Sequence, residues 1–196
     1  MRTAEKLSLS GIISEARRLT GGCLPCGADE LLVRKAYREM YTVLLESQKH
    51  RLKQIQKLGH IPNWSKIILV LGQPGIGTTW FLTYVLVRRL MEGKPTIFQL
   101  ADFDLDAHTE PIHYLIDKNG VRHMDSPSFS EMDNPDIWVL ADRKPLRQPR
   151  FAEDHNWLVV VTSSPREDNY YYICKEYSPV KYYLPVWDWE EVVAAA

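Results

Sequence analysis

The sequence predicts an α/β domain of three layers, in which a mostly parallel sheet lies between helices. Core strands are expected near 66–71, 95–100, 136–141 and 157–162, and the apolar runs at 137–141 and 157–161 lack the alternation of a half-exposed strand. Runs of this kind are typical of parallel strands that are buried on both faces. A glycine-rich segment separates the first run from a helical pattern, and strand, loop and helix in this order favour an α/β fold.

The first 63 residues are expected to form an N-terminal helical extension. Apolar residues between 28 and 58 recur at helical spacing and predict one or two helices, which Gly59 and Pro62 end. A second helical pattern follows the glycine-rich segment, and Gly93 is expected to stop it.

A β-hairpin is expected between the second and third core strands. Short β-prone runs at 113–116 and 121–124 flank Asp117-Lys118-Asn119-Gly120, and Asn-Gly between such runs is the strongest local hairpin signal. We expect this hairpin to protrude from the edge of the sheet. Beyond the last core strand, the sequence predicts a short helix within 167–177 and a terminal strand at 182–185.

Composition bounds the class of protein. The chain has 196 residues, of which 45% are apolar and 25% charged, as in an ordinary globular protein. We expect a core at 64–186 and, at 187–196, the start of a truncated C-terminal helix or lid. No run approaches the roughly 20 apolar residues that span a bilayer, and no signal-peptide pattern opens the chain, so an intracellular protein, cytoplasmic or nuclear, is expected.

Cysteine spacing does not predict a zinc site. Cys23 and Cys26 have the spacing of half a zinc site, but no second pair of ligands is placed to complete it.

Basic residues concentrate near the N-terminus. Residues 1–66 carry 12 Lys and Arg against 6 Asp and Glu, a balance of 12 − 6 = +6, and the rest of the chain carries 12 against 19, a balance of −7. A cluster at Lys49, Arg51, Lys53 and Lys57 is compatible with contact to nucleic acid. A solvated helix face is the favoured interpretation, because basic residues are stabilised near the C-terminal end of a helix.

Residues 72–79 match a phosphate-binding loop at every position but one. The pattern G-x-x-x-x-G-K-[ST] is met at Gly72, Gly77 and Thr79, with a strand expected before it and a helix after it. Glycines let successive backbone N–H groups converge on an anion, and the helix directs its positive dipole end to the same point. The predicted fold is therefore that of a P-loop NTPase. The candidate nucleotide-binding residues are Gly72, Gln73, Pro74, Gly75, Ile76, Gly77, Thr78, Thr79 and Trp80.

Thr78 stands where this pattern has lysine. A lysine would donate charge-assisted hydrogen bonds to the β- and γ-phosphates, each worth about 1.5–3 kcal/mol. The backbone part of the site is thus present while its main cation is missing.

Polar residues after two other core strands complete the candidate site. Asp142 follows a buried run and is the candidate Walker B carboxylate, which would hold Mg²⁺ together with the Thr79 hydroxyl. Thr162 and Ser163 follow the last core run and could sense the terminal phosphate. For these residues to lie beside the phosphates, the 157–162 strand must lie between the phosphate-loop strand and the Asp142 strand.

The strand that ends at Asp142 offers no candidate for activating water. Arg143 and Lys144 follow Asp142, where hydrolysing relatives with an inserted sensor strand usually carry Glu. Arg143, Arg147 and Arg150 could reach a phosphate as arginine fingers, although an exposed basic loop is favoured. Catalytic residues therefore stay unknown, and so does whether the chain is an enzyme.

Residues 71–96 read Leu-Gly-Gln-Pro-Gly-Ile-Gly-x-Thr-x-Phe-Leu-x-Tyr-x-Leu-x-Arg-Arg-Leu-x-Glu-Gly-Lys-Pro-Thr. This string resembles the NTPase domain of fungal Crinkler-type and retrotransposon-hot-spot-like proteins, and the resemblance extends over roughly residues 30–191. It implies a P-loop ATPase-like core, often one module of a larger effector or nuclear protein. The chain departs from the family at Thr78, where the family pattern has lysine.

Two interpretations of function stay open. One is a domain that binds Mg-ATP with a degenerate Walker A motif and has weak or no hydrolysis. The other is a pseudo-NTPase that binds no nucleotide and acts as an interaction module of an effector-like protein.

Overall fold

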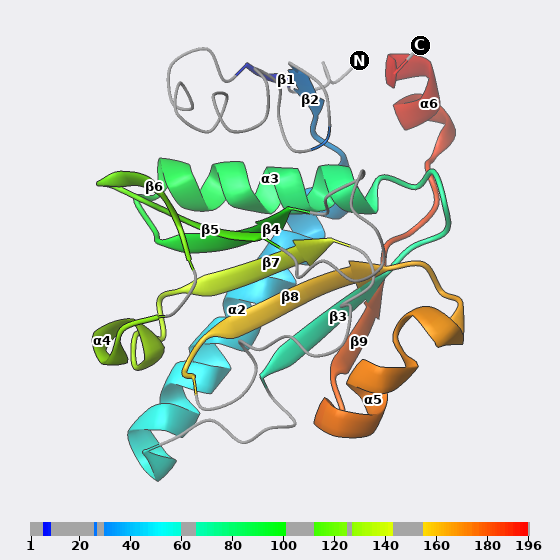
Figure 1. Ribbon diagram of the computed structural model, residues 1–196. Coiled ribbons are helices and arrows are strands. Elements are labelled where there is room, and N and C mark those ends of the chain that lie inside the picture. Colours follow the sequence, from blue (N-terminus) through cyan, green and yellow to red (C-terminus); the bar gives the residue numbers. More distant parts are fainter. Residues whose placement is uncertain are drawn as a thin grey trace.

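The computed structural model describes residues 6–8, 26, 30–59, 66–100, 112–124, 127–142 and 155–195, and its centre is one large sheet (Figure 1). The strands are β3 (Ile67–Leu71), β4 (Thr96–Leu100), β5 (Ile112–Asp117), β6 (Gly120–His123), β7 (Trp138–Asp142), β8 (Leu158–Ser163) and β9 (Val180–Tyr183). Their order is β6-β5-β4-β7-β8-β3-β9. Neighbouring strands from β4 to β9 in this order are parallel, whereas β5 is antiparallel to both β4 and β6. The predicted α/β class with a mostly parallel sheet is therefore confirmed.

The predicted position of the last core strand is also confirmed. Strand β8 lies between β3 and β7, with Val159 opposite Ile67 on one side and opposite Val139 on the other. This order brings the carboxyl ends of the three strands to one edge, with Asp142 opposite Thr162 and Leu71 opposite Ser163.

Both faces of the central strands are covered, which explains why their sequences do not alternate. In β3, Ile68 and Val70 belong to an apolar cluster with residues of helices α2 and α3. The intervening residues Ile67 and Leu69 belong to a second cluster, to which α5 contributes Ile173. A strand with apolar neighbours on both faces reads as a continuous apolar run.

Helix α2 (Lys35–Leu58) is a single helix of 24 residues. The predicted helical range of 28–58 was wrong at its start, because Glu30–Leu32 form strand β2, which pairs with β1 (Lys6–Ser8) in a separate two-stranded sheet. Leu31 and Val33 are buried and the less buried Leu32 lies between them, which is the alternation of a strand. The apolar side of α2 joins the main core: Tyr37, Tyr41 and Leu44 share a cluster with Phe81 and Trp138.

Helix α3 (Thr78–Met91) follows the glycine loop and ends as predicted at Gly93. Gly93 has a φ of 66°, and the next residue, Lys94, donates its N–H to the Arg89 carbonyl at 2.9 Å. This geometry satisfies a carbonyl of the last turn that the helix leaves free.

The predicted hairpin exists, but it does not protrude from the sheet. Residues 112–116 of β5 pair with the whole of β4, so β5 and β6 extend the sheet in its own plane (Figure 1). Gly120, with a φ of 118°, allows the chain to turn back into β6. The edge of the parallel sheet offers unpaired backbone groups to the hairpin, and pairing satisfies them.

The C-terminal part contains three further helices and the edge strand. A 3₁₀ turn (Glu167–Asn169) and α5 (Tyr171–Tyr177) precede β9, and α6 (Trp189–Ala195) follows it. The predicted short helix within 167–177 is confirmed, and the predicted strand at 182–185 is found two residues earlier.

A short helix α4 (Phe129–Met132) precedes β7. Across the described residues, no helix has the length and apolar content needed to cross a membrane.

Candidate functional site

The glycine loop leaves the carboxyl end of β3 and enters α3 at Thr78. Its first residue is anchored to the neighbouring strand, because the Gly72 N–H donates to the Ser163 carbonyl at 3.0 Å. Within the loop, the Ile76 N–H donates to the Gln73 carbonyl at 3.0 Å, which closes a tight turn. The loop therefore lies at the sheet edge where the predicted site residues were expected.

The geometry of the loop requires its glycines. Gly75 and Gly77 have φ values of 84° and 95°, which side-chain-bearing residues rarely adopt. A Cβ atom on Gly72 would lie 2.5 Å from Ile76 Cγ2 and 2.7 Å from Thr78 Cγ2. The Thr78 side chain thus folds back toward Gly72.

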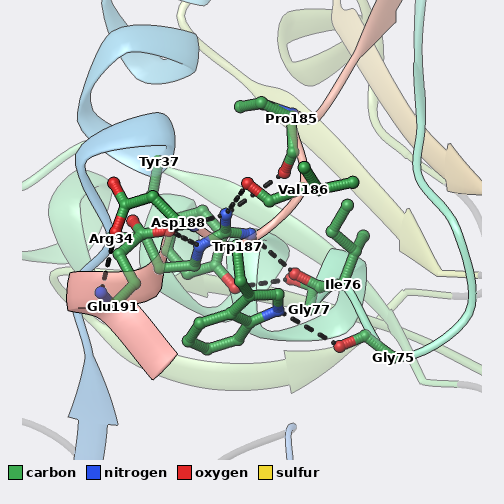
Figure 2. A network of polar contacts seen from close by, with 10 residues as sticks. All are labelled: Arg34, Tyr37, Gly75, Ile76, Gly77, Pro185, Val186, Trp187, Asp188 and Glu191. Carbon is green, nitrogen blue, oxygen red and sulfur yellow. Dashed lines mark hydrogen bonds and ion pairs between the residues drawn. The ribbon is translucent and has the colours of Figure 1, made fainter. Parts of the chain in front are cut away.

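Three side chains outside the loop hold its successive carbonyl groups (Figure 2). Trp187 Nε1 donates to the Gly75 carbonyl at 3.3 Å, and Arg34 Nη1 donates to the Ile76 carbonyl at 2.8 Å. Tyr37 Oη donates to the Gly77 carbonyl at 2.8 Å. These contacts fix the direction of three consecutive carbonyls from outside the loop.

The first turn of α3 offers N–H groups that the helix itself does not use. The Gly77 carbonyl accepts the helical bond from the Phe81 N–H at 2.9 Å, so the N–H groups of residues 78–80 precede this first helical donor. Free N–H groups and the positive end of the helix dipole together favour an anion at this point.

Three predicted side chains converge beside the loop. Asp142 Oδ2 accepts from the Thr79 hydroxyl at 2.5 Å, and Asp142 Oδ1 accepts from the Thr162 hydroxyl at 2.8 Å. Asp142 is 8% exposed and Thr162 is fully buried. The sequence thus predicted which polar groups meet here, and strand order explains why. Ser163, also buried, contributes its carbonyl to Gly72 as described above.

Hydroxyl and carboxylate oxygens are ligands that suit Mg²⁺. Thr79 and Asp142 therefore form a donor pair of the right chemistry at the end of the loop. The described part of the chain contains no group of three or more His, Cys, Asp or Glu residues that could hold a metal ion by themselves. An ion bound here would complete its coordination with water and with ligand oxygens.

Among the described residues, no side chain that contacts the loop takes the place of the missing lysine. Arg34 is the guanidinium that bonds to the loop, and its side chain is completely buried. Its Nε and Nη2 groups donate to Glu191 Oε2 at 3.0 and 2.9 Å, and Nη2 also reaches the Pro185 and Val186 carbonyls at 3.1 Å each. Because these donors are engaged, Arg34 supports the loop from behind rather than facing a bound anion.

This supporting network was not predicted from the sequence. Arg34 and Glu191 are 157 positions apart, and no local pattern links them. One local signal did exist: Asp188 and Glu191 form a capping box at the start of α6, in which the Glu191 N–H donates to Asp188 Oδ1 at 2.8 Å. Burial raises the pKa of Tyr37 to about 12, an effect that the neighbouring Arg34 charge partly offsets.

The basic cluster of α2 requires a correction. Arg51 is 2% exposed and points into the protein, where it donates to Gln48 Oε1 at 3.0 Å and to the Trp157 carbonyl. It cannot contribute to a nucleic-acid surface, whereas Lys49, Lys53 and Lys57 are exposed. The Gln48 side chain and the Trp157 carbonyl supply oxygen acceptors to this buried guanidinium.

Several residues singled out in the sequence lie outside the described residues: Arg143, Lys144, Arg147, Arg150 and Cys23.

No protein-family model matches the chain, and no curated protein matches it.

Proposed function

We propose that this chain is a nucleotide-binding domain of the P-loop NTPase class that binds Mg-ATP weakly and hydrolyses it poorly or not at all. The observation that carries the proposal is the convergence of Thr79 and Thr162 on Asp142 beside a glycine loop. The sheet order supports it, since β8 separates the loop strand from the Asp142 strand. The resemblance of residues 71–96 to Crinkler-type and retrotransposon-hot-spot-like NTPase domains supports the same class.

Each part of the site has an assigned task in this proposal. Backbone N–H groups of the loop and of the first turn of α3, other than those of Gly72 and Ile76, which donate to carbonyls of the protein, bind the phosphates. Thr79 with Asp142 holds Mg²⁺, which neutralises phosphate oxygens. Thr162 orients the Asp142 carboxylate, and Thr162 and Ser163 lie where a terminal phosphate is sensed. No described residue is assigned as the base that activates water.

The missing lysine sets the expected affinity. Two lysine–phosphate hydrogen bonds at about 1.5–3 kcal/mol each amount to about 3–6 kcal/mol, or roughly two to four decades in Kd. We expect a Kd in the micromolar range or weaker, with strong dependence on Mg²⁺. Submicromolar binding that EDTA does not change would contradict this assignment of the site.

Calorimetric titration of the Thr78→Lys variant with Mg-ATP tests the proposal. Because the backbone cradle is already formed, the new ammonium should tighten binding at least tenfold and raise the melting temperature in Mg-ATP by linkage. Hydrolysis should recover far less, since no catalytic base is supplied. Asp142→Ala in the Thr78→Lys background is the control for the metal. Equal binding by the unmodified chain and Thr78→Lys, or with and without the Asp142 carboxylate, would refute the proposal.

The second candidate function is a pseudo-NTPase interaction module. It is favoured by Thr78 itself and by exposed aromatic side chains near the C-terminus, where Tyr171, Tyr183 and Trp189 are 63%, 64% and 78% exposed. Isolated exposed apolar residues are common on protein surfaces, so this observation weighs less. The same titration separates the two functions, because an interaction module gains no affinity from Thr78→Lys.

A further inference from the structure

One buried guanidinium joins the glycine loop to the C-terminal segment of the chain. Arg34 donates through Nη1 to the Ile76 carbonyl of the loop. Through Nη2 it donates to the Pro185 and Val186 carbonyls and, with Nε, to Glu191. We call residues 185–191 the strap. Figure 2 shows the strap and the loop on either side of this guanidinium.

The strap also contacts the loop directly. The Trp187 indole ring stacks on Arg34, with 4.4 Å between the guanidinium carbon and the ring centroid, and its N–H donates to the Gly75 carbonyl. Movement of the strap would therefore remove the donor of the Gly75 carbonyl and the acceptors that hold Arg34 in place against the Ile76 carbonyl.

Parts of the strap and of α6 gain little from apolar burial. Val186 is 73% exposed and Trp189 is 78% exposed. Segments that bury few apolar groups open at a lower free-energy cost than the core does. The polar contacts through Arg34 and Trp187 are thus an important part of what keeps the strap docked.

We propose that the strap regulates the anion site of the loop. Docked, it directs the Gly75 and Ile76 carbonyls away from the site; undocked, it leaves them free to turn toward a bound anion and oppose it. Arg34 is then a positioning residue that acts through the loop carbonyls. The ligand in this inference is the Mg-ATP of the proposed function, on which the inference rests. Coupling of this kind is reciprocal, so Mg-ATP should also stabilise the docked strap.

Matched variants in the strap test the inference. Glu191→Gln weakens the ion pair with Arg34, and Glu190→Gln makes the same change at the neighbouring exposed position. Trp187→Phe removes the indole donor, and Trp189→Phe changes a tryptophan that is exposed. Calorimetry with Mg-ATP should show binding weakened at least fivefold for Glu191→Gln and Trp187→Phe, because coupled sites typically change each other's affinity about 5–150-fold. Binding should weaken less than twofold for Glu190→Gln and Trp189→Phe.

Hydrogen exchange followed by mass spectrometry gives a measurement that does not depend on nucleotide. Without ligand, Glu191→Gln should speed exchange in peptides covering residues 72–82, while Glu190→Gln should not. With Mg-ATP, exchange in α6 of the unmodified chain should slow. If both glutamine variants behave alike in the 72–82 peptides, or if they bind Mg-ATP equally well, the strap has no regulatory role and the inference is wrong.

The same data distinguish this failure from failure of the proposed function. If neither the unmodified chain nor Thr78→Lys binds Mg-ATP, the nucleotide proposal fails, and the exchange difference between Glu191→Gln and Glu190→Gln then decides whether the strap controls the loop. A variant that only loses stability would show a lower melting temperature with an unchanged Kd, which would also overturn the inference.

Discussion

Gly77 is the position of the loop where a single methyl group should do the most damage. Its φ of 95° costs an alanine about 1–2 kcal/mol. In addition, the new Cβ would lie 2.1 Å from Tyr37 Oη, and this side chain is only 1% exposed and packs on Phe81. Overpacking of a buried site typically costs a further 1–3 kcal/mol or so. Gly77→Ala should therefore lower the free energy of unfolding by about 2–5 kcal/mol.

Gly75→Ala is the matched control, and Tyr37→Phe tests the cause. Gly75 has a similar φ of 84°, but a Cβ at this position would meet no atom within 4 Å, so alanine there should cost only about 1–2 kcal/mol. Removing the Tyr37 hydroxyl leaves the Cζ atom at 3.4 Å, an ordinary contact, so Gly77→Ala should cost less in the Tyr37→Phe background. Urea unfolding of the four chains of this double-mutant cycle measures the coupling. The reasoning is refuted if Gly77→Ala costs no more than Gly75→Ala, or if Tyr37→Phe gives no relief.

Three further predictions concern the same structure. The pKa of Tyr37 is about 12 in the folded protein and about 10 in the unfolded chain, so the stabilisation that this difference provides is at most about 2–3 kcal/mol. It is complete below pH 10 and is lost between pH 10 and 12, and urea unfolding across this range should therefore show a smaller loss of stability in Tyr37→Phe. Arg51→Ala should lower the melting temperature by several degrees, because it removes the hydrogen bonds of a buried guanidinium to Gln48 and to the Trp157 carbonyl, whereas Lys53→Ala should leave it nearly unchanged. Equal effects would contradict the buried role of Arg51. Thr162→Val should reduce the free energy of unfolding by about 1–3 kcal/mol through loss of the hydrogen bond to Asp142, and Thr162→Ser, which keeps the hydroxyl, should recover most of it in chemical denaturation.

The sheet and the polar centre of the site could be predicted because their signals are local. Strands β7 and β8 are short apolar runs that end at polar residues, and parallel strands bring such ends to one edge. The prediction that Asp142 and Thr162 lie close together needed only the order of the strands. The structure adds the register, in which the two residues lie opposite each other. The in-plane position of the hairpin could not be predicted in this way, because pairing of β5 with β4 depends on the edge that β4 leaves open.

The support of the loop could not be predicted, because its chemistry is carried by backbone carbonyls. Carbonyl groups are present at every residue, so a sequence does not reveal which of them needs an outside donor. Arg34 looks like one more basic residue near the start of a helix, and only the fold places it between the Ile76 carbonyl and Glu191. A buried arginine is stable only when oxygen atoms surround it, and here the loop and the strap both supply them. The requirement for charge compensation at one side chain thus joins the start of α2 and residues 185–191 at the glycine loop.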